Sequence, residues 1–455
     1  MKSKSMLNAD IEISKTLKKM ERIYSNKYGL ANKSIVYDLN HTSIALVSNR
    51  YTISNVIPMF HAHVENVHFS TWDGGGVALT REKSKVKAYG EFIERYCGNN
   101  ISNDHDVDII YDSYNHLKTN QECLDFSELI HFEDCLYDEI EFPYERYFTH
   151  SHISWVKGKD LLNGRDIWLP AQKVFLGIEL LRGEQPHISW MSTGLACGAD
   201  YYQAAISALC EVVERDSFML TWLLKLAGIR IVIDSIRSLA LTNLYNHICK
   251  HLVGEDHLFI YDISRTEGIY TVLTFIRNDN PDSFGLIVSA ASHVNAEIAL
   301  LKSLEELCQT QAFAYGKLIG YEKRTCQTLK EHEVTDLHKH TLYYSTGRRS
   351  HEIDFISASN CHINLSDMKD FFKGSDEEIM EYLVELFRQK NQPIFTADIT
   401  RHEIRECGFR VVRAIISGYN DLEYSHKFRQ LKNRRLQEYQ KKYNAQINSA
   451  PHPFP

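Results

Sequence analysis

The sequence predicts an α+β protein with mixed or antiparallel sheets, packed helices and an internally repeated acidic helix motif. Runs rich in β-branched and aromatic residues in the middle of the chain indicate strands, and charged segments with helical periodicity indicate helices. One acidic pattern occurs three times on such helices. With 455 residues, of which 44% are hydrophobic and 24% charged, the chain can bury a sizeable core.

Charge and apolar patterning limit the classes of partner. A net charge of −8 provides no global basic field, so a phosphate-bearing partner needs a local site. No apolar stretch follows the basic residues at the start, and the most apolar segments are too short to cross a bilayer. The ten cysteines include no C-x-x-C pair, which argues against a zinc ribbon or a redox motif. We expect a cytoplasmic protein with no nucleic-acid partner and no membrane insertion.

The chain divides into an N-terminal extension, residues 1–64, and a main domain, residues 65–455. A charged, periodic segment at 9–29 predicts a helix in the extension. Residues 101–190 are rich in aromatic residues, His and acids, and their short alternating runs predict a β region with insertions. Further runs bounded by Asp, Asn, Gly or Pro predict a central sheet. These runs are residues 228–234, 258–264, 270–277 and 284–292.

The repeated motif places acidic side chains on one face of each predicted helix. Its aligned positions are Ala88, Glu91, Glu94 and Arg95; Ala208, Glu211, Glu214 and Arg215; and Ser303, Glu306 and Gln309. Residues three or four apart share a helix face, and the positions between them are largely apolar. We therefore expect buried helices whose carboxylates need cations or hydrogen-bond donors. Five carboxylates and two arginines are too acidic to balance themselves.

Magnesium would resolve this imbalance, because it takes oxygen ligands from a few carboxylates and completes its octahedron with water and substrate phosphates. The two arginines are suited to clamping phosphate oxygens as bidentate forks. No P-loop or kinase motif is present, so the hypothesis is an ATP site built from acidic helices and metal ions. The glycine loop 74–76, before the first acidic helix, is either a phosphate-binding loop or a plain turn.

Plainer interpretations stay open beside this hypothesis. A single E-x-x-E-R motif is usually a solvated helix face held by ion pairs. The histidine pairs His61/His63 and His338/His340 have no carboxylate or Cys at ligand-like spacing, so we expect most of these side chains at the surface. No nucleophile elbow marks a Ser or Cys as catalytic.

The last residues, "APHPFP", carry prolines at alternate positions. Proline-rich tails are usually disordered. The alternate prolines nevertheless stiffen the tail in an extended form, and the terminal carboxylate of Pro455 becomes an acceptor positioned at low entropic cost.

Five separated motifs carry a resemblance to a known family. They are "GGGVALTREKSKVKAYGEFIERYCG", "STGLACGADYYQAAISALCEVVERDSFMLTW", "AEIALLKSLEELCQTQ", "ADITRHEIRECGFRVVRAIISG" and "PHPFP". Together they resemble the three acidic helix motifs, the late D-x-T…V-x-R segment and the terminal P-x-P-x-P of the YcaO family, specifically its azoline-forming cyclodehydratases of ribosomal peptide biosynthesis. The resemblance covers about residues 65–455 and implies a YcaO fold that ends in the tail.

The resemblance implies ATP-dependent chemistry on a peptide backbone. In the family, a Cys, Ser or Thr side chain of a precursor peptide attacks the preceding amide carbonyl. The γ-phosphoryl group of ATP moves to that oxygen, and loss of phosphate leaves a thiazoline or oxazoline. Such a reaction needs positioning and charge neutralisation more than a protein nucleophile.

The resemblance also implies roles for individual residues. It assigns Mg2+ to Glu91, Glu94, Glu211 and Glu214. It assigns ATP to the same carboxylates and to Gly74, Gly75, Gly76, Arg95, Gln203, Arg215, Glu306 and Gln309. Catalytic positions are Arg413, Pro451, Pro453 and Pro455. The chain departs from the family pattern at Gly75, where a basic residue is common, and at Ala199 and Gln203, where an acid or amide pair is common.

The expected partners follow from the same resemblance. The chain is too short to include a fused E1-like domain, so we expect a separate E1-like protein that binds the leader of the ribosomal precursor peptide. A flavin-dependent azoline dehydrogenase is a further expected component, and a homodimer within a complex the expected assembly. The alternatives are a thioamide- or amidine-forming YcaO enzyme and a catalytically silent scaffold subunit, which Mg2+-dependent nucleotide binding would separate.

Overall fold

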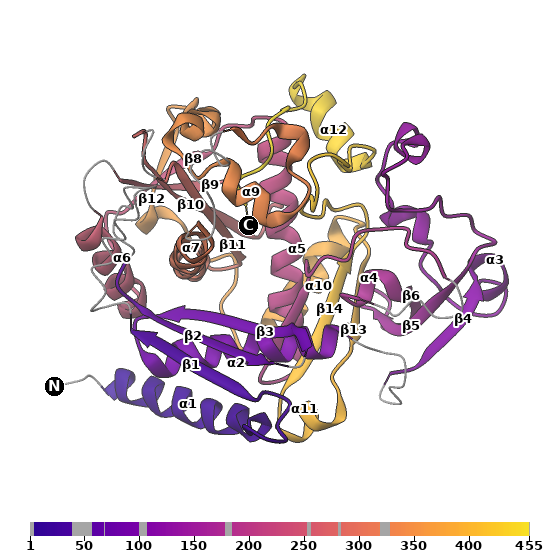
Figure 1. Cartoon of the computed structure of the whole chain (residues 1–455), viewed down its shortest axis with the longest axis horizontal. Coiled ribbons are helices and arrows are strands. Elements are labelled where there is room, and N and C mark those ends of the chain that lie inside the picture. Colours follow the sequence, from indigo (N-terminus) through magenta and orange to yellow (C-terminus); the bar gives the residue numbers. More distant parts are fainter. Residues whose placement is uncertain are drawn as a thin grey trace.

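The protein folds into three β-sheets connected by helices, which confirms the predicted α+β class. A computed structural model describes residues 4–38, 57–67, 69–99, 107–177, 184–252, 256–280, 284–318 and 328–454. Figure 1 shows the sheets and their helices arranged around the long helix in the middle of the molecule. Within the described ranges, no helix combines the length and the apolar character that a membrane span requires.

The three sheets are mostly antiparallel. The first, ordered β1-β2-β3, consists of β1 (Lys33–Asp38), β2 (Phe60–Asn66) and β3 (Phe69–Ala78). The second, ordered β11-β10-β9-β8-β12, consists of β8 (Ile229–Val232), β9 (His257–Asp262), β10 (Tyr270–Arg277), β11 (Leu286–His293) and β12 (His362–Asn364). The third is ordered β4-β5-β13-β14-β7, with β6 paired to β5. Its strands are β4 (Ile109–Ser113), β5 (His152–Asp160), β6 (Arg165–Pro170), β7 (Leu195–Gly198), β13 (Ile394–Asp398) and β14 (Arg410–Ile416). The four runs predicted for the central sheet coincide with or overlap β8 to β11.

Three helices carry the repeated acidic motif, as predicted: α2 (Arg81–Gly98), α5 (Tyr201–Leu223) and α7 (Ala296–Leu318). The other helices are α1 (Lys4–Met20), α3 (Tyr114–Leu117), α4 (Ala171–Val174), α6 (Leu239–His251), α9 (Leu337–Tyr343), α10 (Asp376–Gln389), α11 (His402–Glu406) and α12 (Arg434–Tyr443). Short 3-10 segments are η1 (Glu21–Ile23), η2 (Phe126–Leu129), η3 (Asp134–Asp138), η5 (Glu331–Glu333), η6 (Gly347–Ser357) and η7 (Leu365–Asp367). The helix predicted at 9–29 therefore starts earlier, and its regular part ends at Met20.

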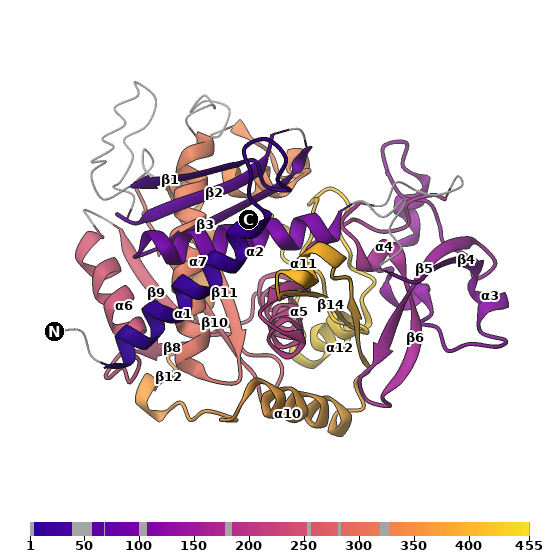
Figure 2. The same cartoon turned by 90° about the horizontal axis from the view of Figure 1, so that it is seen from below.

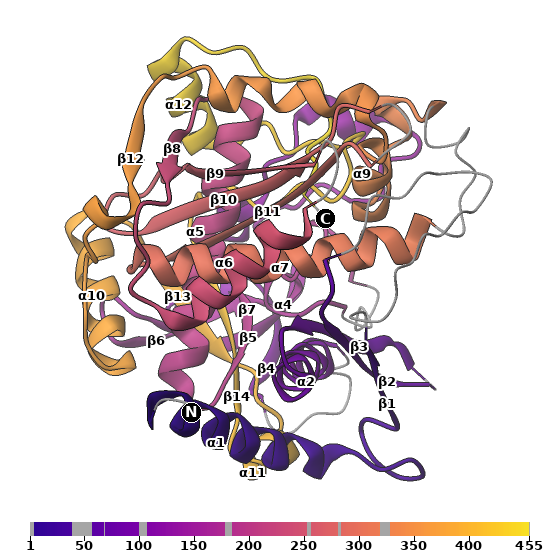
Figure 3. The same cartoon turned by 90° about the vertical axis from the view of Figure 1, so that its left-hand side faces the viewer.

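Helix α5 is the centre of the fold. It is apolar on almost all sides and largely buried, as expected of a helix enclosed by other elements. One side packs on β7 and β14 and the other on β10 and β11, so that α5 lies between two sheets (Figure 2). Helix α7 covers β10 and β11 and also reaches β3 (Figure 3). Because α2 packs on β3 and touches β7, the three acidic helices meet where the three sheets converge.

Strand β3 and helix α2 form a tight unit that positions the first motif. Thr80 caps the helix by accepting a hydrogen bond from the backbone of Lys83. A Cβ on Gly74 would lie 2.2 Å from the carbonyl oxygen of Ala88, and one on Gly76 would lie 2.3 Å from that of Ser84. Only glycine lets this strand approach the helix backbone so closely. Gly75, between them, faces the other way.

Replacing Gly74 or Gly76 with Ala is expected to destabilise the protein by about 1–3 kcal/mol or more, because the added methyl group collides with backbone that cannot move independently. Gly75→Ala is the matched control, since its nearest contacts would be ordinary ones of 3.8–3.9 Å. Urea unfolding of the three variants tests this expectation. Equal stability loss in all three would contradict the packing described for β3 and α2.

Candidate functional site

The acidic side chains of the three helices converge on one region. A Cβ on Gly75 would lie 3.8 Å from Glu91 Oε2 on α2 and 3.9 Å from Gln309 Nε2 on α7. Repulsion from Glu211 on α5 contributes to the raised pKa of Glu94 on α2. The motif residues predicted from three separate segments are therefore brought together.

Backbone N–H groups and arginines hold these carboxylates in place. Glu91 accepts hydrogen bonds from Gly75 N at 2.8 Å and from Arg95 Nη2 at 3.2 Å. Glu94 accepts one from Cys197 N on β7 at 2.8 Å. Each donor comes from an element that packs on α2 or from α2 itself, so the fold fixes where these charges lie.

The second helix is arranged in the same way. Glu211 accepts a hydrogen bond from Gly194 N at 3.3 Å and lies 3.4 Å from Arg215 Nη2. Arg215 Nε lies 3.1 Å from Glu214 Oε1, which makes an ion pair. The N–H does not point at this oxygen, which is buried and accepts no hydrogen bond from the described residues. Glu214 therefore keeps unused capacity for a donor or a cation.

Burial and mutual repulsion disfavour the charged form of several carboxylates in this cluster. Burial, with repulsion from Glu211 and Glu91, raises the pKa of Glu94 to about 8. Burial, with repulsion from Glu306 and Glu211, raises the pKa of Glu214 well above its ordinary range. Burial also raises the pKa of Glu306. The two arginines thus leave an excess of negative charge, as the sequence predicts.

The ionisation of Glu94 is expected to lower the stability of the nucleotide-free protein as the pH rises from about 5 to 8. The pKa of Glu94 rises from 4.5 to about 8 on folding, so this carboxyl holds more protons in the folded chain than in the unfolded chain across the window. Its contribution to the free energy of unfolding therefore falls with pH, whereas buried histidines with lowered pKa values contribute in the opposite direction below about pH 6.5. Urea unfolding of the wild type and of Glu94→Gln at several pH values isolates the contribution of Glu94. The stability of Glu94→Gln relative to the wild type should rise with pH, and a constant difference would contradict this ionisation.

These residues fit a bound nucleotide with Mg2+. Carboxylate oxygens on three helices, an oxygen of Glu214 without a hydrogen bond and arginines beside them suit a divalent cation and phosphates. Among the described residues, no three His, Cys, Asp or Glu side chains are already gathered to hold a metal ion.

The C-terminal tail is buried beside α5. Ala450 O accepts a hydrogen bond from Trp222 Nε1 at 3.1 Å, and Pro451 O accepts one from Tyr344 OH at 2.6 Å. Phe454 is 3% exposed, and its ring lies 4.4 Å from the Arg215 guanidinium. The tail therefore runs to the acidic helix rather than into solvent, with Pro451 and Pro453 inside this buried stretch. Pro455 lies outside the described residues.

Histidines hold this tail, which corrects the expectation that His340 lies at the surface. His340 is fully buried on α9, its Nδ1 donates to His452 O at 2.8 Å, and its ring stacks on that of His452 with centroids 3.9 Å apart. Nε2 of His452 donates to Glu423 O at 2.9 Å. The expectation failed because the contacts that bury His340 come from a segment more than 100 residues later.

Arg413 holds the loop that contacts the acidic site. It is 1% exposed and donates to the carbonyls of Lys173, Thr193 and Met191 at 2.8, 2.8 and 2.5 Å. Burial lowers its pKa to about 10. Because Gly194 follows Thr193 and contacts Glu211, Arg413 acts on the acidic site through this loop.

Gln203 lies away from the carboxylates. It is exposed at the start of α5 and its Oε1 accepts a hydrogen bond from Ala199 N at 2.7 Å. Eight residues separate it from Glu211, which corresponds to about 12 Å along the helix. Ala199 and Gln203, which both depart from the family pattern, thus bond to each other in the turn before α5.

Three further residues lie at the site without a role predicted from the sequence, although His61 belongs to a histidine pair and Phe454 to the terminal motif. Lys302 lowers the pKa of both Glu214 and Glu306 by its charge, and its spacing of four from Glu306 was the available signal. His61 Nε2 would lie 3.8 Å from a Cβ on Gly75. The position of Phe454 over Arg215 depends on the tertiary fold and had no local signal.

Comparison with known proteins identifies the family. A model of YcaO cyclodehydratases, described as ATP- and Mg2+-binding, matches residues 75–420. The chain belongs to the YcaO family, as its motifs predict. The predicted use of ATP and Mg2+ agrees with that description.

Solved structures share the fold at low sequence identity. A heterocyclase in complex with substrate and cofactor has a TM-score of 0.74 and 17% identity, covering 97% of this chain and 57% of that chain. YcaO from Methanopyrus kandleri, bound with AMPPCP and Mg2+, has a TM-score of 0.61 and 18% identity, covering 90% and 91%. The E. coli microcin synthetase McbBCD complex has a TM-score of 0.56 and 14% identity, covering 87% and 93%.

A sequence relative is an uncharacterized protein of Methanothermobacter thermautotrophicus, 23% identical over 276 residues. The match covers 59% of this chain and 66% of that protein. The chain thus spans just under two thirds of this relative and little more than half of the heterocyclase.

Proposed function

We propose that the protein is an ATP- and Mg2+-dependent cyclodehydratase that converts Cys, Ser or Thr of a ribosomally made precursor peptide into thiazoline or oxazoline. The observation that carries this proposal is the meeting of three acidic helices with the buried tail, whose Phe454 lies on the arginine of the second acidic motif. Family membership and the heterocyclase-like fold support it. The 65–455 domain boundary is part of the proposal.

In the proposed reaction, the peptide side chain attacks the preceding amide carbon, and the amide oxygen leaves as phosphate after accepting the γ-phosphoryl group that Mg–ATP supplies. Glu91, Glu94, Glu211 and Glu214 would hold Mg2+ and fix its position. Arg95 and Arg215 would neutralise phosphate charge. Glu306 and Gln309 would complete the nucleotide site at the third helix. A preorganised set of charges of this kind lowers a barrier mainly by electrostatic stabilisation.

The remaining residues would position the strand, loop and turn that surround the acidic side chains. Gly74 and Gly76 let β3 approach α2, and Gly75 leaves room beside Glu91 and Gln309. Arg413 is a positioning residue that holds the loop contacting Glu211. Gln203 would support the turn before α5 and reach the nucleotide only indirectly.

The tail residues Pro451, Pro453 and Pro455 would place the reacting amide and assist proton transfer. The rigid backbone at Pro451 and Pro453 keeps Phe454 against Arg215 at low entropic cost. A separate E1-like protein that binds the peptide leader, a flavin-dependent azoline dehydrogenase and a homodimeric, cytoplasmic assembly complete the proposal.

The test combines phosphate release with peptide mass. The purified protein, Mg–ATP, a Cys-containing precursor peptide and its leader-binding partner should release one phosphate for each water lost from the peptide. Phosphate release with exchange of oxygen for sulfur or nitrogen would indicate the thioamide- or amidine-forming alternative. Absence of Mg2+-dependent nucleotide binding would leave the scaffold interpretation.

A further inference from the structure

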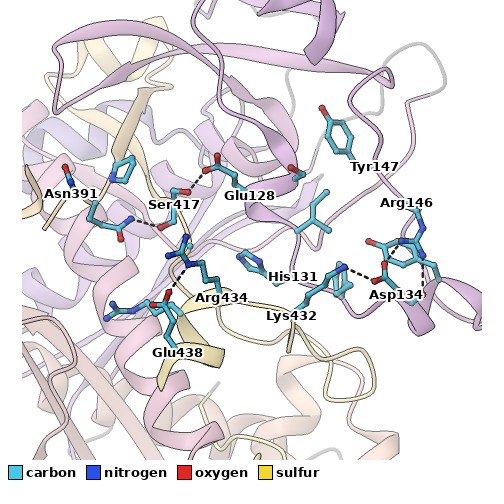
Figure 4. Close-up of a pocket in the computed structure, with 18 of the residues that line it drawn as sticks. Glu128, His131, Asp134, Arg146, Tyr147, Asn391, Ser417, Lys432, Arg434 and Glu438 are labelled. Carbon is cyan, nitrogen blue, oxygen red and sulfur yellow. Dashed lines mark hydrogen bonds and ion pairs between the residues drawn. The ribbon is translucent and has the colours of Figure 1, made fainter. Parts of the chain in front are cut away.

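A large polar cavity lies apart from the acidic helices. Its volume is about 840 Å3, within the range of ligand sites. One wall is the 127–147 segment, which contains η2 and η3, and the other is formed by residues 390–393, the 417–418 turn and the start of α12 (Figure 4). The proposed reaction does not involve this cavity.

A mostly buried histidine lies between this cavity and the interior. His131 is 8% exposed and lines the cavity. Burial lowers its pKa to about 4, so the ring is neutral and offers one N–H and one lone pair. A peptide group, with one carbonyl and one N–H, matches this pair of functions.

Cations outnumber acids around the opening. Five basic and three acidic side chains line the cavity, although the whole chain carries a net charge of −8. Asp134 serves two cations at once, because it pairs with Arg146 and also accepts from Lys432 Nζ at 2.8 Å. Arg434 pairs with Glu438 and Arg435 with the buried Asp216, each at 2.8 Å, so the surplus lies at Arg146, Lys432 and Lys390. Lys390 lies 3.8 Å from Glu267, a carboxylate outside the lining. An anionic group would therefore be attracted to this opening.

Contacts connect the cavity with the acidic site. His131 also lines a small inner cavity of about 10 Å3, together with Lys173, Asp421 and Val212. Val212 is the neighbour of Glu211 on α5, and Lys173 O accepts from Arg413 Nε. The backbone is pinned as well, since His131 O accepts a hydrogen bond from Lys432 N at 2.9 Å. Packing and hydrogen bonds therefore connect the cavity with the elements that carry the carboxylates.

We propose that this cavity binds an acidic segment of the peptide substrate, at a distance from the residue that reacts. The neutral imidazole would bond the peptide backbone, and the surplus cations would face Asp or Glu side chains. Binding energy from such a remote segment helps hold the reacting amide in place. This inference rests on the proposed function, because it assumes that a peptide is the substrate.

The test uses two synthetic peptides of Gly and Ser that are identical except for one segment. Each contains one Gly-Cys pair and a fluorescent label, and the variable segment is either three glutamates or three lysines. Fluorescence anisotropy should show that the wild type binds the glutamate peptide about ten-fold more tightly than the lysine peptide. Equal binding of the two peptides, or no binding of either, would overturn the proposal.

Reversing the charge of two cavity cations tests whether the preference for the glutamate peptide arises in this cavity. The double variant Arg146→Glu/Lys432→Glu should lose or invert it, since both cations line the cavity. Arg165→Glu/Lys442→Glu is the matched control, because both side chains are exposed and neither lines the cavity. A preference that survives in the first variant, or that disappears equally in the control, would contradict binding in this cavity.

A steric variant gives an independent reading. Ser127→Trp, at the exposed rim, should weaken binding of the glutamate peptide about ten-fold, whereas Thr119→Trp, exposed elsewhere on the same lobe, should not. In ring formation with the precursor peptide, the cavity variants should raise the peptide KM and leave the ATP KM unchanged. Failure of the wild type to form rings would refute the proposed function, whereas an unchanged peptide KM in active cavity variants would refute only this inference.

Discussion

Replacing Glu214 with Gln is expected to lower ring formation by about 100-fold or more, while the nucleotide-free protein stays at least as stable as the wild type. Burial, with repulsion from Glu306 and Glu211, raises the pKa of Glu214, and one of its oxygens accepts no hydrogen bond from the described residues. The substitution relieves this repulsion but removes a proposed Mg2+ ligand. Phosphate release and urea unfolding, measured on the same preparation, test both halves.

Glu305→Gln is the matched control for this prediction. Glu305 is also buried, but it pairs with Lys87 at 2.9 Å and with Lys83, linking α7 to α2. Burial alone would raise its pKa, yet the two lysines lower it. Its neutralisation should therefore cost about 1–3 kcal/mol of stability. If Glu214→Gln destabilised the protein as much as Glu305→Gln, the excess of negative charge at the site would be contradicted.

Removing residues 451–455 is expected to abolish ring formation. The deletion leaves His340 Nδ1 without its acceptor in the tail and uncovers Arg215 and Phe218, whereas Tyr344 OH keeps Glu352 Oε2 at 2.7 Å as an acceptor. Part of the loss would therefore reflect reduced stability, with each buried donor left unpaired costing about 1–3 kcal/mol. Peptide mass spectrometry measures the activity, and thermal unfolding measures the stability.

Phe454→Ala separates the role of the tail from its contribution to stability. It removes the ring over Arg215 but keeps the backbone hydrogen bonds of the tail. Phe355→Ala is a suitable control, because this ring packs on Trp222 of α5, with centroids 5.4 Å apart, whereas the ring of Phe454 lies over Arg215. Ring formation should fall at least about ten-fold further in Phe454→Ala than in Phe355→Ala. Equal losses would mean that the tail contributes packing alone.

Local sequence patterns predicted the helices of the site well. The spacing of Glu91 and Glu94, repeated at Glu211 and Glu214, specifies a shared helix face regardless of the tertiary fold. Apolar neighbours correctly indicated that these helices are buried. The excess of acidic over basic residues could also be counted directly, because it depends on composition and proximity alone.

Long-range contacts could not be predicted in this way. Runs of β-branched and aromatic residues marked β8 to β11, but the parallel pairing of β12 with β8 joins segments far apart in the chain. The burial of His340 depends on His452, and the three carbonyls bound by Arg413 come from helix α4 and from the loop at 191–193. No local pattern encodes such pairings, since they arise only when the sheets and helices pack.

We propose that ATP phosphorylates the amide oxygen of the peptide in this acidic site. The most direct measurement uses a precursor peptide with oxygen-18 in the carbonyl that precedes the reacting Cys, with Mg–ATP and the leader-binding partner. We expect the wild type to give one labelled oxygen in phosphate for each water lost from the peptide, and Glu214→Gln to give neither product. Loss of water from the peptide accompanied by unlabelled phosphate would contradict it.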